Sequence, residues 1–92
     1  MSGDKRYLLS KVPPGAGHVL DLGGGIGALR KSLVNRGYRY VNLDLSPRGV
    51  GAVLGDAQRT PFRSRFFEVV VSGDSLEHFP DPRAALAEVR RL

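Results

Sequence analysis

Short apolar runs alternate with helical patterns along the 92 residues of the chain. The clearest unit begins with an apolar run at 18–22, passes through a glycine cluster and continues into a helical pattern at 28–36. Leu29 and Leu33 fall on one face of that pattern. Gly37 marks its end, because glycine adopts the left-handed conformation that terminates helices. The pattern therefore predicts a strand, a tight turn and a helix.

Further strands are expected at the apolar runs 40–45, 52–54 and 66–72. The last run is almost entirely apolar, as expected for a strand covered on both faces. Only residues 46–51 separate the second strand from the third, which is too few for an ordinary helical crossover. Asp81 and Pro82 predict a helix start, since aspartate caps helices and proline is favoured at the first helical position. Another short helix is expected at 4–11.

Strands that alternate with helical segments are typical of an α/β protein with a parallel sheet. The length of 92 residues predicts a single domain, residues 1–92. Its alternating pattern indicates that the sheet is open and Rossmann-like. The chain has no cysteine, and we expect no metal site. It also has no signal-peptide layout and no apolar run near the ~20 residues that span a bilayer. We therefore expect a cytoplasmic protein without a membrane partner.

The formal charge of +5 raises the question of nucleic-acid binding. The basic residues are spread along the chain, and no aromatic residues interleave with them as on an RNA-stacking surface. A solvated charged surface is the favoured interpretation, so nucleic acid is not expected as a partner.

The glycine cluster carries the strongest chemical signal. Residues 21–27 read Asp-Leu-Gly-Gly-Gly-Ile-Gly. Glycines let the backbone turn sharply and let a ligand approach it, and the helix that follows directs unpaired N–H groups at that ligand. Gly23, Gly25 and Ala28 fit the dinucleotide pattern G-x-G-x-x-G/A. Asp21, two residues before the first glycine, instead suits a cationic sulfonium ligand with an amino group. A turn without any ligand is the third interpretation.

Aspartates fall at or just after the predicted strand ends, at Asp21, Asp44, Asp56 and Asp74. Ligands of open α/β sheets bind outside the carboxyl ends of the strands, so a cationic or hydroxyl-rich ligand is favoured. Asp44 is placed to accept hydrogen bonds from both hydroxyls of a ribose. The alternative for Asp44 is a turn-initiating role before residues 46–47.

From residue 19 onward the chain resembles the class I S-adenosylmethionine-dependent methyltransferases, in particular the type 11 group. The resemblance rests on ordered segments at 21–27, 43–47, 55–57 with 61–62, 67–70 and 76–82, and the tail 86–92 continues the pattern. It implies the N-terminal half of that fold, with about four strands in the order 3-2-1-4. The group normally continues into three more strands that carry much of the substrate pocket. The domain is therefore expected to be truncated after the fourth strand and incomplete at its C-terminus.

The resemblance implies a set of residues that bind the cofactor, S-adenosyl-L-methionine. This set is Asp21, Gly23, Gly24, Gly25, Asp44, Leu45, Asp56, Ala57 and Ser72. Asp21 and the glycine backbone would hold the amino and carboxylate ends of the methionine moiety, with the Ser72 backbone beside it. Asp44 would bind the ribose, and Leu45 would lie against the adenine.

The adenine ring has two further contacts in this scheme. Asp56 would accept a hydrogen bond from the adenine amino group, and the Ala57 backbone N–H would meet the ring.

His78 is a candidate general base near the expected methyl group. Packing of His78 in the loop after the fourth strand is the alternative.

Three functions remain open. The first is a methyltransferase that acts on an unidentified acceptor, expected to be a small molecule. The second is a non-catalytic S-adenosylmethionine-binding fragment or interaction module, and the third is an NAD-binding module.

Because the acceptor-pocket strands are missing, little methyl transfer is expected from the isolated chain. The fourth strand would form a sheet edge, at which we expect pairing into a homodimer or else aggregation. The alternative is a monomer in which residues 1–12 fold over this edge.

Overall fold

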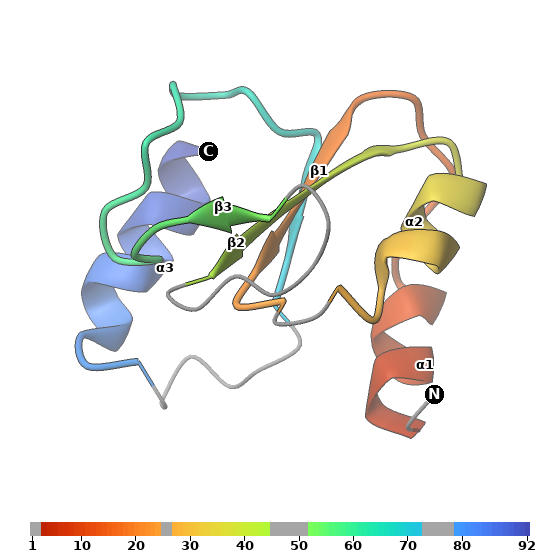
Figure 1. Ribbon diagram of the computed structural model, residues 1–92, viewed down its shortest axis with the longest axis horizontal. Coiled ribbons are helices and arrows are strands. Elements are labelled where there is room, and N and C mark those ends of the chain that lie inside the picture. The colour runs from red at the N-terminus through yellow and green to blue at the C-terminus, as the bar shows by residue number, and fades with distance from the viewer. Residues whose placement is uncertain (1–2, 25–26, 45–51, 73–78) are drawn as a thin grey trace.

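The computed structural model describes residues 3–24, 27–44, 52–72 and 79–92. These residues form one sheet with helices on both of its faces (Figure 1). The elements in chain order are α1 (Gly3–Ser10), β1 (His18–Leu22), α2 (Arg30–Asn35), β2 (Arg39–Asp44), β3 (Val53–Leu54), β4 (Val69–Val71) and α3 (Pro82–Arg91).

The described sheet has four strands in the order β3-β2-β1-β4, and every neighbouring pair is parallel. This arrangement confirms the α/β class and the predicted order 3-2-1-4. The central strand is β1, in which Asp21 lies opposite Asn42 of β2 and Val71 of β4. Since the strands run parallel, their carboxyl ends meet along one edge of the sheet.

The side chains of β1 alternate between two hydrophobic clusters, because successive residues of a strand point to opposite faces. The cluster on the side of α1 and α2 consists of Leu9, Val12, Val19, Leu29, Leu33, Tyr38 and Val71. The cluster on the side of α3 consists of Leu20, Leu22, Leu43, Ala57, Phe67 and Leu92. Three of the five β1 residues are fully buried apolar side chains, so β1 is the common wall of both clusters.

Several elements are shorter than their sequence patterns predicted. The helix expected at 28–36 spans Arg30–Asn35, because residues 27–29 form a turn. The strand expected at 66–72 spans only Val69–Val71. Ahead of it the Phe66 ring lies 4.5 Å from His18, and the Phe67 ring lies 4.9 Å from Phe62. The two phenylalanines therefore belong to an aromatic cluster instead of the strand.

The outer strand β4 pairs with β1, and a pairing of its other edge with a second copy of the chain stays a prediction. The expected connector at 46–51 lies outside the described residues. In the part of the chain that the structure describes, no helix combines the length and the apolar character that crossing a membrane requires.

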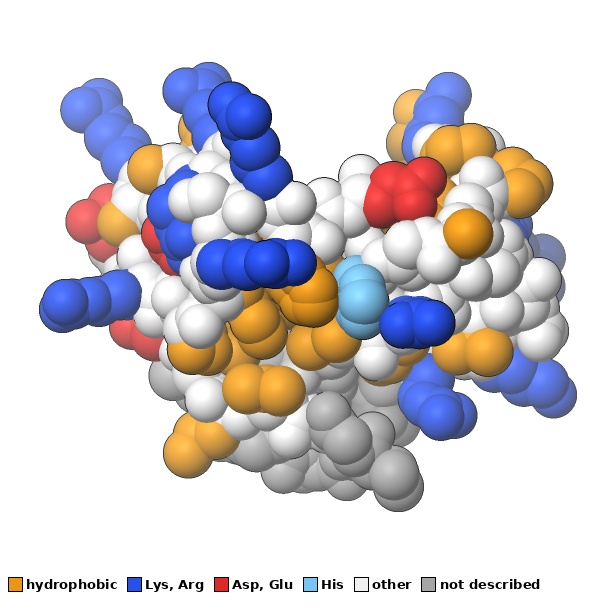
Figure 2. Space-filling model, turned by 90° about the horizontal axis from the view of Figure 1, so that it is seen from above, with side chains coloured by type: hydrophobic (Ala, Val, Ile, Leu, Met, Phe, Trp, Pro, Cys, Tyr) orange, Lys and Arg blue, Asp and Glu red, His pale blue; other side chains and the backbone are white. Residues whose placement is uncertain are grey.

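The positive charge is distributed over the surface. Figure 2 shows Lys and Arg side chains around the rim and across the middle of one face, with apolar, acidic and uncharged groups between them. They do not merge into one continuous basic patch on that face. The expectation that nucleic acid is not a partner remains a prediction.

Replacement of Gly37 by alanine should strongly destabilise the fold. Gly37 has a φ of +104°, and an added Cβ would collide with the backbone oxygen of Gly15. We expect Gly37→Ala to lower the free energy of unfolding by at least about 2 kcal/mol in urea denaturation. Gly27→Ala is the control: its φ is +83°, but the nearest atom to the added Cβ is 3.7 Å away. Gly27→Ala should lower the free energy of unfolding by about 1 kcal/mol. Equal losses in the two variants would refute the collision at Gly37.

Candidate functional site

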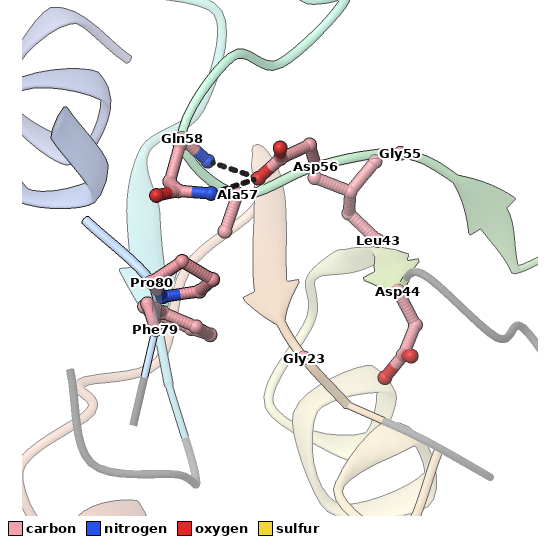
Figure 3. A pocket seen from close by; sticks show the side chains of 9 residues that line it. All are labelled: Gly23, Leu43, Asp44, Gly55, Asp56, Ala57, Gln58, Phe79 and Pro80. Atoms are coloured by element: carbon pink, nitrogen blue, oxygen red, sulfur yellow. Dashed lines mark hydrogen bonds between the residues drawn. The ribbon is translucent and has the colours of Figure 1, made fainter. Parts of the chain in front are cut away.

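A pocket of about 140 Å³ opens at the carboxyl ends of the central strands (Figure 3). It is lined by Gly23, Leu43, Asp44, Gly55, Asp56, Ala57, Gln58, Phe79 and Pro80. These residues come from the turn after β1, the end of β2, the segment after β3 and the segment before α3. Phe79 and Pro80 form an apolar side of the pocket, and carboxylates and an amide supply polar groups elsewhere in its wall.

The structure brings four of the predicted site residues together in this wall: Gly23, Asp44, Asp56 and Ala57. Ser72 does not line the pocket, and its hydroxyl donates to the Leu22 carbonyl oxygen over 3.3 Å. Three predicted residues lie outside the described residues: Gly25, Leu45 and His78. The remaining two, Asp21 and Gly24, lie close to the pocket without lining it.

Asp21 lies beneath the glycine turn, where only 1% of its surface is exposed. The Tyr40 hydroxyl donates a hydrogen bond of 2.6 Å to Asp21 Oδ2. Beside this pair, the Gly24 N–H donates to Asn42 Oδ1 over 3.1 Å. Burial and the hydrogen bond to Asp21 raise the pKa of the Tyr40 hydroxyl, so this hydroxyl stays a donor. We call Asp21, Tyr40 and Asn42 the polar floor of the turn.

The polar floor explains why position 24 is a glycine. A Cβ at Gly24 would lie 2.6 Å from Asp21 Oδ2 and closer still to the Asn42 amide oxygen. The backbone of the turn therefore rests directly on polar side chains of β1 and β2. The preceding residue, Gly23, donates its N–H to the Leu43 carbonyl over 2.8 Å and has a φ of +70°. These contacts fix the path of the chain from β1 into the pocket wall.

The sequence pattern alone did not identify Tyr40 and Asn42, the two residues that join Asp21 in the polar floor. Tyr40 and Asn42 alternate with Val41 and Leu43 in β2, so they share one face of the strand. The signal was available, because an asparagine within an otherwise apolar strand beside a glycine motif indicates a buried polar contact. Phe79 and Pro80 offered no such signal, since only the tertiary fold places them against the ends of β2 and β3.

Asp56 forms a tight turn with Gln58, a residue that the sequence analysis did not single out. The backbone N–H of Gln58 and its Nε2 both donate to Asp56 Oδ1, each over 2.9 Å. The side-chain and backbone hydrogen bonds from Gln58 hold the pKa of Asp56 below its usual value. The carboxylate in this wall is therefore ionised at neutral pH.

The loop that follows this turn is fastened to α3 by Glu88. Glu88 Oε2 accepts from the Thr60 N–H over 2.8 Å and from the Thr60 hydroxyl over 2.6 Å. Arg91 Nε donates to Glu88 Oε1 over 2.8 Å and forms an ion pair with it. The Arg91 and Thr60 hydrogen bonds lower the pKa of Glu88 to about 2, although burial opposes the shift. Helix α3 thus supports the chain segment that carries Asp56 and Gln58.

Within the described ranges, no three histidine or acidic side chains lie close enough together to hold a metal ion. The pocket wall offers carboxylates, an amide, backbone groups and an apolar side. The carboxylate acceptors suit a ligand with hydroxyl or amino donors, and the apolar side suits a flat apolar part.

Comparison with known proteins gives a consistent result. A family model described as a methyltransferase domain matches residues 20–92. The ubiquinone/menaquinone biosynthesis C-methyltransferase UbiE of Desulfotalea psychrophila is 30% identical, over 96% of this chain and 42% of the relative. The demethylmenaquinone methyltransferase of Thermobifida fusca is 33% identical, over 80% of this chain and 38% of the relative. The chain thus spans well under half the length of these curated relatives.

Solved structures share the fold. The PH0226 protein of Pyrococcus horikoshii superposes with a TM-score of 0.78 at 28% identity, over 96% of this chain and 46% of that protein.

Loss of the Tyr40 hydroxyl should destabilise the polar floor. Tyr40→Phe removes a donor from a carboxylate that is almost completely buried, and we expect a loss of about 1–3 kcal/mol in the free energy of unfolding. Tyr7→Phe is the matched control, because Tyr7 is 66% exposed. Urea denaturation of both variants measures the difference, and a loss no larger than that of Tyr7→Phe would contradict the role of Tyr40.

The contribution of Glu88 to stability should depend on pH. Its pKa falls from 4.5 to about 2 on folding, so its stabilising effect is present in full above pH 4.5. The effect is lost as the pH falls from 4.5 towards 2, because the unfolded chain then binds the proton more readily. Glu88→Gln should therefore be less stable than the wild type at neutral pH, and the two should converge in acid. Thermal melts across this range test the expectation, which a pH-independent difference would overturn.

Proposed function

The chain belongs to the methyltransferase-domain family of class I S-adenosylmethionine-dependent methyltransferases, and from this premise we propose that its pocket binds S-adenosyl-L-methionine. One observation carries the proposal. Asp44 at the end of β2 and Asp56 in the segment after β3 lie in the wall of a single pocket beside Gly23. Two carboxylates and an apolar side match the hydroxyls, amino group and flat ring of an adenosine.

Asp44 is assigned to the ribose. It is the last residue of β2 and lines the pocket, and a carboxylate can accept hydrogen bonds from two neighbouring hydroxyls. Asp56 and the Ala57 N–H are assigned to the adenine, next to the apolar side formed by Phe79 and Pro80. The contact of Leu45 with the adenine stays a prediction.

The methionine end is assigned to the glycine turn and its polar floor. The backbone of Gly23 and Gly24, with the predicted contact of Gly25, would bind the amino and carboxylate groups. Asp21 holds a negative charge directly below the turn, which favours a cationic ligand above it. The role of the Ser72 backbone beside the methionine part and that of His78 as a base stay predictions.

The bound cofactor would supply an activated methyl group for direct displacement, and this chain would contribute its binding and orientation. We propose a small-molecule acceptor. The names of the D. psychrophila and T. fusca relatives point to quinone-type rings as the class to test first. Since the chain spans only 38% to 42% of those relatives, this proposal concerns the cofactor site and assigns no acceptor contacts.

Calorimetry with S-adenosyl-L-homocysteine tests the cofactor assignment. We expect the wild type to bind this ligand more tightly than NAD. Asp44→Asn should weaken binding by about ten- to a hundred-fold, because hydrogen bonds to a charged group are lost.

Asp81→Asn is the matched control for Asp44→Asn. It removes the same charge at the N-cap of α3, where the Asp81 side chain accepts from the Ala84 N–H. Asparagine caps helices as well as aspartate does, so affinity should not change. Tighter binding of NAD, or an equal loss in the two variants, would refute the assignment.

A further inference from the structure

Gln58 controls the orientation of a carboxylate in the pocket wall. Both hydrogen bonds from Gln58 end on the same oxygen, Asp56 Oδ1, and Figure 3 shows the two residues joined by this pair of contacts. Two bonds from different parts of one residue restrict the rotation of the carboxylate. Asp56 is therefore held in a single orientation, although it is not buried.

This arrangement also determines what Asp56 can bind. An ionised carboxylate offers only acceptor positions, and its lowered pKa keeps it ionised. Among the described residues, no group donates to Asp56 Oδ2, so this oxygen retains its capacity to accept. The neighbouring Ala57 N–H likewise finds no acceptor within the described ranges. Both residues line the pocket, so its wall contains an acceptor and a donor on adjacent residues.

The turn is also supported from outside the pocket. Thr60, which follows it closely, is bound through both its N–H and its hydroxyl to Glu88 of α3. Within the turn, the Arg59 N–H donates to the Asp56 carbonyl over 3.0 Å. The acceptor and the donor are therefore fixed relative to the sheet before any ligand arrives, which strengthens discrimination between ligands.

The edge of a 6-aminopurine matches this pair, with an amino donor at C6 and an acceptor at N1. A 6-oxopurine presents the reverse, with an acceptor at C6 and a donor at N1. Its carbonyl would face the Asp56 carboxylate, and its N1–H would face the Ala57 N–H. Sites built around hydrogen bonds reject such ligands strongly, because polar groups are left unpaired.

We propose that Gln58 is a specificity-determining positioning residue, which holds Asp56 as a fixed acceptor and thereby makes the pocket select 6-aminopurine over 6-oxopurine ligands. This inference rests on the proposed function, because it assigns the purine end of the cofactor to the Asp56–Gln58 turn. Gln58 acts through Asp56 and needs no contact of its own with the ligand.

The test compares two ligands, S-adenosyl-L-homocysteine and S-inosyl-L-homocysteine, by calorimetry on the same protein. The wild type should prefer the adenosyl ligand by at least about ten-fold. Gln58→Met keeps the length of the side chain and the backbone bond but removes the Nε2 donor. We expect it to reduce the preference by about three- to ten-fold. Arg59→Met is the matched control on the next residue, whose side chain is exposed, and it should keep the wild-type preference.

Each outcome decides a separate point. If the wild type fails to bind the adenosyl ligand, the proposed function is wrong. If it binds but Gln58→Met keeps the wild-type preference, or loses affinity for both ligands equally, the role of Gln58 in specificity is refuted. Asp56→Asn gives a second measurement should Gln58→Met fold poorly. Its amide offers a donor to a 6-oxo group, so the preference should fall further, and an unchanged preference would overturn the inference.

Discussion

The burial of the Asp21 carboxylate in the central strand is the constraint on which the rest of the site depends. A charge at 1% exposure is tolerated only with hydrogen-bonding partners, and β2 supplies the Tyr40 hydroxyl for this purpose. Asn42 extends the same polar row and accepts from Gly24. The turn after β1 must therefore lie close to polar side chains, which only a residue without a Cβ permits. The burial of Asp21, its hydrogen bond from Tyr40 and the glycine at position 24 depend on one another. Together they place Gly23 in the pocket wall.

The two ends of the pocket are held by different means. The glycine turn rests on the polar floor within the sheet, where the surrounding clusters exclude water. The Asp56–Gln58 turn lies outside the sheet, and the loop that continues it is held to α3 by the hydrogen bonds between Thr60 and Glu88. Glu88 in turn forms a partly exposed ion pair with Arg91 of the same helix. Interactions between exposed charges are weakened by salt and by protonation, whereas a buried network is much less affected. The contacts of Gly23 and Gly24 at the end assigned to the methionine moiety are therefore less sensitive to salt and pH than those of the Asp56–Gln58 turn.

The sequence predicted those features that depend on local pattern. Apolar runs located the four strands, and the glycine cluster with Asp44 and Asp56 located the pocket, because such residues follow strand ends that must meet at one edge. It did not predict the Glu88–Thr60 contact, which joins residues 28 positions apart. The sequence also predicted a longer β4 than the structure has. An apolar run does not distinguish strand residues from phenylalanines that pack into an aromatic cluster.

The placement of Asp21 shows how a motif residue can matter without lining a pocket. Spacing alone put it near the ligand, because a carboxylate two residues before the first glycine is close to the strand end. In β1, however, side chains alternate, so Asp21 points to the face of α1 and α2, while Leu20 and Leu22 point to the face of α3. Tyr40 and the turn itself then cover it. We therefore infer that Asp21 acts on a ligand through the geometry of the turn and through its charge, while a direct contact between Asp21 and the ligand stays a prediction.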